Sequence, residues 1–425
     1  MGEWREVSFE KLFKIPLRNG LTKPSRVRGS GFLMVNMKEI FSIDRIDGHS
    51  MERVPLNEKE IQTSLLEKGD LLFARQSLVL DGAGKCSIIK NIYEKMTFES
   101  HLIRCRLDES QASSEFYYYL FSSNYGKNLM KTIVEQVAAA GIRGSDLAKL
   151  KVPCPPLEMQ HTISKIGQAL DDKIELNRKM NETLEEMARA IFKSWFMDFD
   201  PVHAKARGEE PAGMPDEIAD LFPSEFVHSD QLNKPIPKGW EVKSLSQLAE
   251  NVKRAISADS IDPESNYIGL EHMPKRCIAL AGWERAEKVT SNKFGFKTGE
   301  ILFGKLRPYF HKVGIAPVDG ICSTDILVIK PKKEKHFGLV LCVASSDAII
   351  TSVTSSSTGT KMPRTNWQDV SKFTVVIPDN EVVDNFNQFI NTLTNRIINN
   401  IHENIILTSI RDSLLPKLIS GEIEV

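Results

Sequence analysis

The sequence lacks the features that mark membrane, secreted and metal-binding proteins. Its 425 residues contain no run of about 18 uncharged apolar residues, and Met1–Glu6 holds no apolar stretch that could act as a signal peptide. The six cysteines form no Cys-x-x-Cys pair and stand near no histidine cluster, so we expect free thiols and no metal site. These absences predict a cytoplasmic protein without membrane association.

Catalytic motifs are missing as well. Gly82–Lys85 has the glycine spacing of a phosphate-binding loop, but Val79 and Cys86 stand where that loop needs a glycine and a hydroxyl residue, so we interpret it as a turn. Pro153–Leu157 lacks the polar and aromatic neighbours of an amino-methyltransferase motif, and we interpret it as a joint between a domain and a helix. Without a nucleophile elbow or a metalloenzyme pattern, the sequence predicts a protein that is not an enzyme and has no cofactor of its own.

The net charge of −1 conceals a division along the chain. Residues 1–155 carry 23 Lys and Arg against 19 Asp and Glu, and residues 237–378 carry 20 against 14. Residues 156–236 carry 9 against 16, and residues 379–425 carry 3 against 7. Two basic segments thus alternate with two acidic ones, which favours two domains that face a polyanion, although scatter of a few charges would look the same.

The chain repeats itself. Trp4 and its neighbours correspond to Trp240 at an offset of 236, Gly69–Arg75 corresponds to Gly299–Lys305 at 230, and Lys149–Pro155 corresponds to Lys372–Pro378 at 223. An ordered series with a shrinking offset is typical of internal duplication with small loop deletions. Strand-like runs at Ser100–Leu107, Asp325–Ile329 and Phe373–Ile377 mix with helical runs such as Phe116–Val134, so we predict an α+β fold for both copies.

Each copy ends in a long helix with a narrow apolar seam. In the first helix the seam is Ile163, Ile166, Leu170, Ile174, Asn177, Asn181, Leu184, Ala188, Ile191 and Trp195; in the second it is Phe386, Ile390, Leu393, Ile397, Asn400, Asn404, Leu407 and Leu414. Steps of three and four residues predict a coiled coil, and asparagine in the seam fixes register and partner. An antiparallel pair would place Asn177 opposite Asn404 and Asn181 opposite Asn400, with the C-terminus beside the first domain. A linker of about 37 residues could also bridge a parallel pair.

The prediction is therefore a protein of five parts. These are a first domain at residues 1–155, a helix at 156–199, a linker at 200–236, a second domain at 237–378 and a C-terminal helix at 379–425. The two similar domains are expected to be separated by the antiparallel coiled coil.

Basic and aromatic residues in the two domains are the candidate DNA contacts. Leu302–Lys312 interleaves bases with aromatics, and a flexible basic loop precedes a core strand in both copies, at Ala140–Asp146 and Thr358–Asn366. The predicted DNA-binding residues are Lys23, Arg26, Arg28, Arg75, Gln76 and Arg143 in the first copy, and Lys305, Arg307, Tyr309, His311, Lys312, Lys361, Arg364 and Asn366 in the second. The alternative for Leu302–Lys312 is a strand whose Phe303 and Phe310 are core and whose charges are solvated.

Several segments resemble the specificity subunit of type I restriction-modification systems over essentially the whole chain. They are Trp4–Val7, Gly239–Val242, Pro155–Gln160, Ile191–Val202, Met214–Asp216, Leu221–Phe226 and Leu414–Ile423. The second joint departs from the pattern, because Pro378-Asp379-Asn380 lacks the Pro-Leu-Glu that follows the first.

The resemblance implies two target-recognition domains that each read half of a bipartite, asymmetric sequence in double-stranded DNA, with the helices setting the gap. It also implies a non-catalytic subunit that docks two modification subunits, and through them restriction subunits, which bring S-adenosylmethionine, ATP and Mg²⁺. The helix ends carry more apolar side chains than one seam can bury, so we predict that these side chains bind the modification subunits. Those residues are Ile191, Phe192, Trp195, Phe196, Leu414, Leu415, Leu418 and Ile419.

Two other functions remain open at this stage. One is a coiled-coil scaffold without DNA recognition, and the other is a DNA-modifying enzyme in its own right. A phosphate reader should lose DNA affinity steeply with salt, whereas a scaffold should not bind DNA at all.

Overall fold

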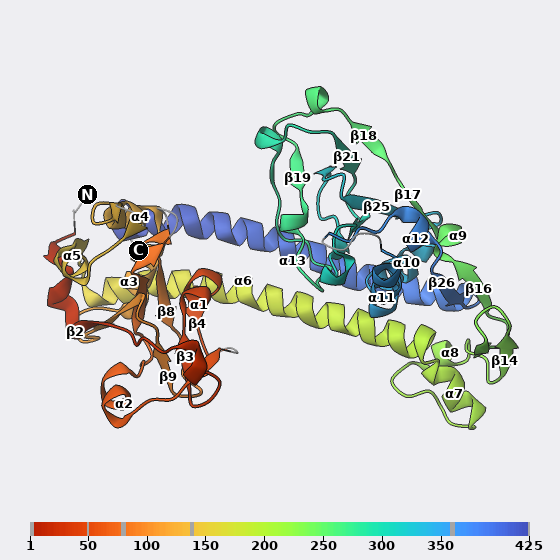
Figure 1. Cartoon of the computed structure of the whole chain (residues 1–425), viewed down its shortest axis with the longest axis horizontal. Coiled ribbons are helices and arrows are strands. Elements are labelled where there is room, and N and C mark those ends of the chain that lie inside the picture. Colours follow the sequence, from red (N-terminus) through yellow and green to blue (C-terminus); the bar gives the residue numbers. More distant parts are fainter. Residues whose placement is uncertain (1–3, 49–50, 78–81, 137–139, 358–361, 424–425) are drawn as a thin grey trace. The chain divides into compact units, whose positions relative to one another are not determined.

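The computed structural model describes residues 4–48, 51–77, 82–136, 140–357 and 362–423. The chain divides into two compact units (Figure 1). Unit 1 comprises Met1–Ile174 and Ile406–Val425, and unit 2 comprises Glu175–Ile405. Each unit contains one copy of the globular domain together with part of both long helices.

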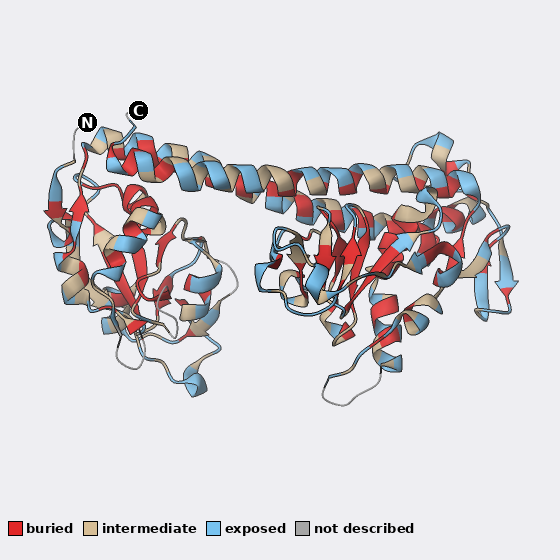
Figure 2. Ribbon diagram, turned by 90° about the horizontal axis from the view of Figure 1, so that it is seen from above, coloured by how far each residue is buried: buried red, intermediate tan, exposed pale blue. Residues whose placement is uncertain are grey.

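Unit 1 is built on a five-stranded sheet of order β2-β10-β6-β8-β4. Its strands are β2 (Phe13–Asn19), β4 (Arg45–Ile46), β6 (Leu71–Ala74), β8 (Cys86–Ile89) and β10 (Leu102–Leu107). A smaller sheet has the order β5-β3-β9, with β3 at Phe32–Val35, β5 at Glu52–Val54 and β9 at Met96–Phe98. The helices are α1 (Met37–Ser42), α2 (Glu58–Ser64), α3 (Ser114–Ser122), α4 (Asn124–Lys131) and α5 (Gly144–Lys149). Strand β6 is the middle strand of the five-stranded sheet, and all of its residues are buried. Figure 2 shows buried residues gathered in the strands of the globular parts.

Unit 2 repeats this plan with two sheets of order β17-β25-β22-β23 and β18-β21-β24-β19-β20. The first contains β17 (Ala249–Asn251), β22 (Ile301–Gly304), β23 (Val313–Ile315) and β25 (Ile326–Pro331). The second contains β18 (Arg254–Ile256), β19 (Asn266–Ile268), β20 (Glu284–Arg285), β21 (Lys293–Phe296) and β24 (Gly320–Cys322). The helices are α9 (Leu245–Leu248), α10 (Phe337–Ala344), α11 (Asp347–Ser356) and α12 (Trp367–Ser371).

Strand pairing confirms the duplication. In unit 1, β1 (Glu6–Ser8) pairs antiparallel with β13 (Lys151–Pro153), and in unit 2, β16 (Glu241–Ser244) pairs antiparallel with β26 (Thr374–Ile377). Strand β3 pairs parallel with β9 and antiparallel with β5, just as β19 pairs parallel with β24 and antiparallel with β20. Since parallel pairs are few in both units, a shared origin explains the match, and both domains are α+β as predicted.

Local elements follow the sequence closely except in one helical run. The strands predicted at 100–107, 325–329 and 373–377 are β10, β25 and β26, and Gly82–Lys85 forms a turn in which Gly84 has φ of 78°. The single helical run expected at 116–134 is the pair α3 and α4. Ser123 separates them, because its hydroxyl accepts a hydrogen bond from Gly126 N at 3.1 Å and so caps α4.

The two long helices are α6 (Leu157–Phe192) and α13 (Asn380–Ser420). A π-helical turn at Lys193–Met197 ends α6. The linker predicted at 200–236 is folded rather than extended, because it forms two short helices and a hairpin. These are α7 (Asp200–Ala206), α8 (Asp216–Ala219), β14 (Phe226–Ser229) and β15 (Lys234–Pro237).

The asparagine seam lies inside unit 2 and confirms the antiparallel pairing. Asn177 Nδ2 donates a hydrogen bond to Asn404 Oδ1 at 2.9 Å, and Asn400 Nδ2 donates to Asn181 Oδ1 at 2.8 Å. At an offset of 223 each bond is the image of the other, so a local pseudo-twofold axis passes between the two pairs. Within unit 1, the end of α13 packs into the core of the first domain, where Leu415, Leu418 and Ile419 are buried. The C-terminus therefore lies beside the first domain, as predicted.

The expected absences can be compared with the described residues. All six cysteines are free thiols, and burial raises the pKa of the Cys342 thiol to about 12. In the described part of the chain, no single helix is long and apolar enough to cross a membrane. Only the bent pair Glu334–Ala344 and Asp347–Ser356, with a 65° angle at the break, reaches the required length and composition.

Candidate nucleic-acid interface

In each domain the central strand leaves the sheet and meets the segment before a short helix. In unit 1, Arg75 N donates to His101 O at 2.8 Å, and Ile142 N donates to Arg75 O at 2.9 Å. In unit 2, Lys305 N donates to Asp325 O at 2.8 Å, and Thr365 N donates to Lys305 O at 3.1 Å. Arg75 and Lys305 are thus equivalent, and we call the surroundings of each one a basic junction.

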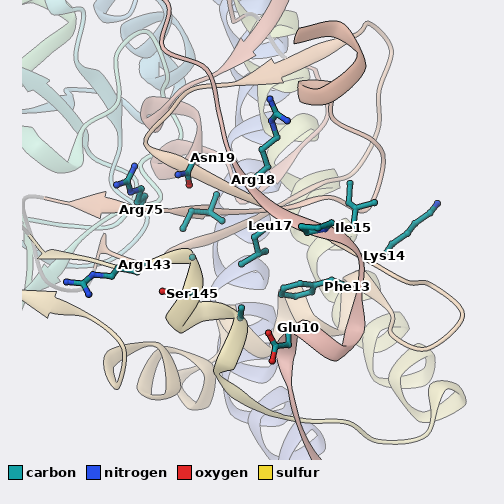
Figure 3. Close-up of a pocket in the computed structure, with 14 residues that line it drawn as sticks. Glu10, Phe13, Lys14, Ile15, Leu17, Arg18, Asn19, Arg75, Arg143 and Ser145 are labelled. Carbon is teal, nitrogen blue, oxygen red and sulfur yellow. The ribbon is translucent and has the colours of Figure 1, made fainter. Parts of the chain in front are cut away.

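The basic junction of unit 1 joins two of the predicted segments. Strand β7 (Gln76–Ser77) pairs with β12 (Ala140–Gly141), which brings Arg75 and Gln76 beside Arg143. In Figure 3 the side chains of Arg75 and Arg143 extend to the same side. Arg143 forms an ion pair with Glu135 at 2.7 Å, but 69% of its side chain is exposed, so a phosphate could replace that weak partner.

A hollow of about 710 Å³ adjoins this junction. Its apolar lining includes Phe13, Leu17 and Ile103, and its rim includes Arg18, Asn19, Arg75 and Arg143 (Figure 3). Sequence reasoning missed Lys14, Arg18 and Asn19, which also line it. The alternation of apolar Phe13, Ile15 and Leu17 with polar neighbours along β2 is the signal that could have found them.

The basic junction of unit 2 contains a strained turn. Arg307 has φ of 50° and His311 has φ of 52°, the left-handed region that side chains other than glycine rarely adopt. The turn is held from outside, because Arg307 N donates to Pro363 O at 2.8 Å and Arg276 N donates to His311 O at 2.9 Å. Backbone strain of this kind persists where surrounding contacts enforce it, and it gathers at functional sites.

Cations and aromatic rings crowd this turn. Lys275 Nζ lies 4.2 Å from the centre of the Phe310 ring, and the Arg307 guanidinium lies 5.8 Å from the same ring. Tyr309 at the tip is 49% exposed. Burial lowers the pKa of the Lys305 ammonium, which Asp325 opposes and the nearby Arg364 reinforces. An added anion would relieve this accumulation of positive charge, and Tyr309 offers a ring and a hydroxyl to a base.

Two predicted contacts in this segment are engaged within their own domain. His311 is 4% exposed, and its Nε2 is 2.9 Å from Ser345 O, so its side chain is buried rather than presented to a ligand. Lys312 Nζ donates to Leu270 O at 2.5 Å, and this bond holds the side chain against its own domain. His311 itself has the left-handed backbone of this turn, which departs from the regular strand alternation that the sequence suggested. Phe303 is fully buried in β22, as the alternative interpretation of this segment expected.

Other predicted contacts are engaged in the fold. Lys23 Nζ pairs with Glu60 at 2.8 Å, and Arg28 donates to Lys23 O at 3.0 Å and also pairs with Glu52. These residues stand beside the small sheet of unit 1, and only Arg26 among them is exposed without a described ion pair. Lys23 and Arg28 stay predictions, but their side chains are only 15% and 24% exposed, so they are less accessible than Arg143.

The described part of the second loop, residues 362–366, leads directly into α12. Asn366 caps α12 by accepting a hydrogen bond from Asp369 N at 3.1 Å, which is a structural role. Arg364 pairs with Asp325 at 3.1 Å, yet 58% of its side chain is exposed beside Lys305. Its counterpart at 140–146 contains β12 and the start of α5, so it is more regular than the predicted flexible loop. Lys361 lies outside the described residues.

The apolar helix ends are not available to a partner, contrary to prediction. Phe192, Trp195 and Phe196 are buried in the main core of unit 2, with Ile191 partly buried against them. Leu415, Leu418 and Ile419 are buried in the core of unit 1, with Leu414 partly buried. The globular domains bury the apolar side chains at the helix ends that the helix seam does not bury. Exposed apolar side chains lie elsewhere on the helices, at Leu176, Met187, Ile405, Ile406 and Ile410.

One group of metal-type side chains occurs among the described residues. Ligand atoms of Glu271, His272 and Glu284 lie within 4.8 Å of one another. His272 Nδ1 accepts a hydrogen bond from Gly269 N at 2.9 Å, which places the ring proton on Nε2 and leaves neither nitrogen free to bind a cation. The group does not form a metal site in this arrangement.

Fold and junctions together define a duplicated protein with two α+β domains, long helices that pair antiparallel and one basic junction in each domain. The chain belongs to the family of type I restriction modification DNA specificity domains, which it matches over residues 1–186 and again over 237–403. Both matches span a globular domain and part of the long helix that follows it.

Individual relatives agree with this family. The type I restriction enzyme MjaIX specificity subunit of Methanocaldococcus jannaschii is 28% identical over 383 residues, which cover 86% of this chain and 80% of that protein. The HindI specificity subunit of Haemophilus influenzae is 26% identical over 403 residues, covering 84% of this chain and 87% of the relative. The crystal structure of a type-I restriction-modification system S subunit from M. genitalium matches with a TM-score of 0.55 at 14% identity, covering 98% of this chain and 96% of that one. This structural match supports the fold.

Proposed function

We propose that this chain is the specificity subunit of a type I restriction-modification system, in which each domain reads one half of a bipartite, asymmetric DNA sequence. The observation that carries the proposal is the repetition of the basic junction at equivalent positions with different side chains. Unit 1 presents Arg75, Gln76 and Arg143, whereas unit 2 presents Lys305, Arg307, Tyr309 and Arg364. Two domains that recognise different DNA sequences need the same backbone arrangement with different contact residues.

The chemistry of these side chains suits the two kinds of DNA contact. Arginine can donate two hydrogen bonds to a guanine edge, and glutamine can pair with adenine, so Arg75, Gln76 and Arg307 are our candidates for base contacts. Arg143, Arg364 and Lys305 are our candidates for phosphate contacts, because their charges are exposed or crowded at the rim. A scaffold without DNA recognition would not need this arrangement twice.

The helices give the proposal a spacing element. We infer that α6 and α13, with 36 and 41 residues, set the unspecified gap between the two half-sites. The reciprocal asparagine bonds would fix their register, because a shift of one turn would bury four amides without partners.

Symmetry also supports the predicted docking of two modification subunits. Met187 on α6 and Ile410 on α13 are related by the offset of 223, and they are 42% and 43% exposed. Two equivalent exposed apolar positions fit two copies of one partner, so we move the docking prediction from the buried helix ends to Met187 and Ile410. In this proposal the chain itself is non-catalytic and cytoplasmic. The modification subunits bring S-adenosylmethionine, and restriction subunits that join through them bring ATP and Mg²⁺.

The test is a genome-wide map of methyladenine in cells that contain the partner subunits, with and without this chain. We expect methylation at one two-part sequence motif that disappears when the chain is removed. An unchanged map would contradict the proposal. Methyl transfer by the purified chain alone would also contradict it, because that result would favour an independent enzyme.

Docking can be tested separately by co-purification. Met187→Glu and Ile410→Glu should each weaken capture of the modification subunit, whereas Met362→Glu, at an apolar residue of unit 2 that is 53% exposed, should not. A chain that carries both Met187→Glu and Ile410→Glu provides the decisive test. If it captures the modification subunit as well as the parent does, the docking assignment is wrong, whereas the proposal for DNA reading is unaffected.

A further inference from the structure

The two domains contact the long helices through interfaces that can be compared residue by residue. The helices align at an offset of 223, so Gly167 corresponds to Ile390 and Asp171 to Thr394. The domains align at the same offset, since Ser123 and Ser346 cap α4 and α11, and Arg143 and Asn366 precede α5 and α12. Tyr119 on α3 therefore corresponds to Cys342 on α10.

In unit 1 the domain supplies the large side chain and the helix supplies the space. Tyr119 is 2% exposed and covers Gly167, where an added Cβ would lie 2.7 Å from the ring carbon Cζ. The Tyr119 hydroxyl donates a hydrogen bond to Asp171 Oδ2 at 2.8 Å. Arg411 on α13 donates to the other oxygen, Oδ1, at 2.8 Å. Tyr119 thus contacts α6 sterically at Gly167 and joins an ion pair between the two helices at Asp171.

In unit 2 the roles are reversed. Ile390 on α13 is fully buried against Gly338 on α10, where an added Cβ would lie 2.9 Å from the Ile390 Cβ. Cys342 takes the place of Tyr119, and Thr394 takes the place of Asp171; both are buried. The helix supplies the large side chain here, and the domain supplies the space.

A second contact differs in the same way. In both units a polar side chain on the long helix accepts a hydrogen bond from a backbone N–H at the start of the helix that faces it, α3 in unit 1 and α10 in unit 2. In unit 1, Ser113 N donates to Gln160 Oε1 at 2.9 Å, and in unit 2, Gly338 N donates to Asn387 Oδ1 at 2.8 Å. The two acceptors are not equivalent, because an offset of 223 maps Gln160 onto Val383. The acceptor of this hydrogen bond therefore lies on a different turn of the long helix in each unit.

We infer that each domain is keyed to its own helix and that the two domains are not interchangeable within this chain. The helix face at Gly167 and Asp171 accepts a domain that presents the phenol of Tyr119 from α3. The helix face at Ile390 and Thr394 accepts a domain that presents glycine and a small thiol. Exchanging the domains would press Tyr119 against Ile390 in one interface and leave a void between Cys342 and Gly167 in the other. The order of the two DNA words would then be built into the chain.

The test is a compensation experiment on the full chain, read by hydrogen exchange of amides in α3 and α10. Gly167→Ile should speed exchange in α3 at least about tenfold and leave α10 unchanged, since opening is local. Adding Tyr119→Cys to Gly167→Ile gives both positions the residues that unit 2 has at the equivalent positions, Cys342 and Ile390. This double variant should return the amide exchange rates of α3 to within about threefold of the parent.

Unit 2 provides the matched control. Cys342→Tyr should speed exchange in α10 and leave α3 unchanged, and adding Ile390→Gly should restore α10. If Gly167→Ile prevents folding, Gly167→Ala replaces it, because even one carbon at that position overlaps the Tyr119 ring. Restoration by Tyr119→Cys must then follow in the same way.

Two results would overturn the inference. One is normal α3 exchange in Gly167→Ile or Gly167→Ala with Tyr119 present. The other is a double variant whose α3 exchanges no more slowly than that of the single variant. Neither result bears on DNA reading, because exchange is measured on the chain without DNA.

Discussion

Units 1 and 2 share a frame and differ in two places of opposite character. The basic junctions are exposed, and there the copies simply carry different side chains, because solvent tolerates any of them. The helix-facing interfaces are buried, and there each change is matched by another: Tyr119 with Gly167 in unit 1, Ile390 with Gly338 in unit 2. The comparison shows that the exposed residues of the junctions differ between the copies without matching changes nearby. At the buried interfaces, by contrast, a large side chain on one side lies against a glycine on the other.

The strongest way to break the comparison is to remove a core side chain that each long helix supplies to one unit. Phe386 and Ile163 are equivalent at an offset of 223 and both fully buried, and Phe386 lies against Phe196 with ring centroids 4.6 Å apart. We expect Phe386→Ala to cost about 3–5 kcal/mol in unit 2, and Ile163→Ala to cost about 2–5 kcal/mol in unit 1. Denaturant-dependent hydrogen exchange would measure both, and a loss in the wrong unit would contradict the division of the helices.

The next comparison removes the ion pair that only unit 1 contains. Asp171→Ala leaves Arg411 without its buried partner and Tyr119 without an acceptor, so we expect a loss of about 2–4 kcal/mol. This is less than for a fully buried pair, because Arg411 keeps 29% exposure and also pairs with Asp412. Thr394→Ala in unit 2 removes only a local bond to Asn391 O and should cost about 1 kcal/mol or less. Equal losses in thermal or urea denaturation would show that the units do not differ here.

A smaller effect separates the two junctions. Arg307→Gly removes the guanidinium, while glycine adopts φ of 50° without strain, so the turn should persist. We expect this variant to lose about 1–3 kcal/mol of binding to sites that contain the second half-sequence, with the first half unaffected. Titration of the assembled complex with DNA mutated in either half would measure this. Lys333→Gly, at a cation away from the junction, is the control.

The smallest expected effect is the pH dependence that Glu185 contributes to the stability of unit 2. Glu185 on α6 is buried, and its Oε2 accepts a hydrogen bond from Ile278 N at 2.9 Å, while burial raises the pKa of its carboxyl group. A carboxyl with a raised folded-state pKa contributes stability that is present below the unfolded-state pKa and is lost as pH rises through the folded-state pKa. The equivalent residue in unit 1, Thr408, does not titrate in this range. Glu185→Gln should therefore flatten the pH profile of unit 2 stability above about pH 4, and an unchanged profile would exclude this group as its source.

Much of the fold could be predicted because it rests on local pattern. The duplication, the α+β character and the asparagine pairing follow from spacing along the chain, and periodicity alone placed Asn177 opposite Asn404. The interfaces with the helices could not be predicted. Nothing in the sequence around Gly167 says that Tyr119, 48 residues earlier, occupies the space beside it.

The site could be predicted in part, for a related reason. Arg75 and Arg143, or Lys305 and Arg364, stand out as basic positions, but only the sheet brings each pair together. The sequence did not show where a distant partner or an unusual dihedral angle affects a candidate. Glu60 engages Lys23, and His311 is buried in a turn with a left-handed backbone. The helix ends around Trp195 were misassigned because a sequence does not show which surface covers an apolar side chain.

The central claim is that two equivalent junctions read two separate DNA words. The most direct measurement is the methyladenine map of cells that carry the parent chain, a chain with residues 302–312 exchanged for those of another family member, or a chain with residues 75–76 exchanged. We predict that the first exchange alters one half of the methylated motif, that the second alters the other half, and that the gap between the halves stays constant. Both halves changing together, or neither changing, would contradict the account.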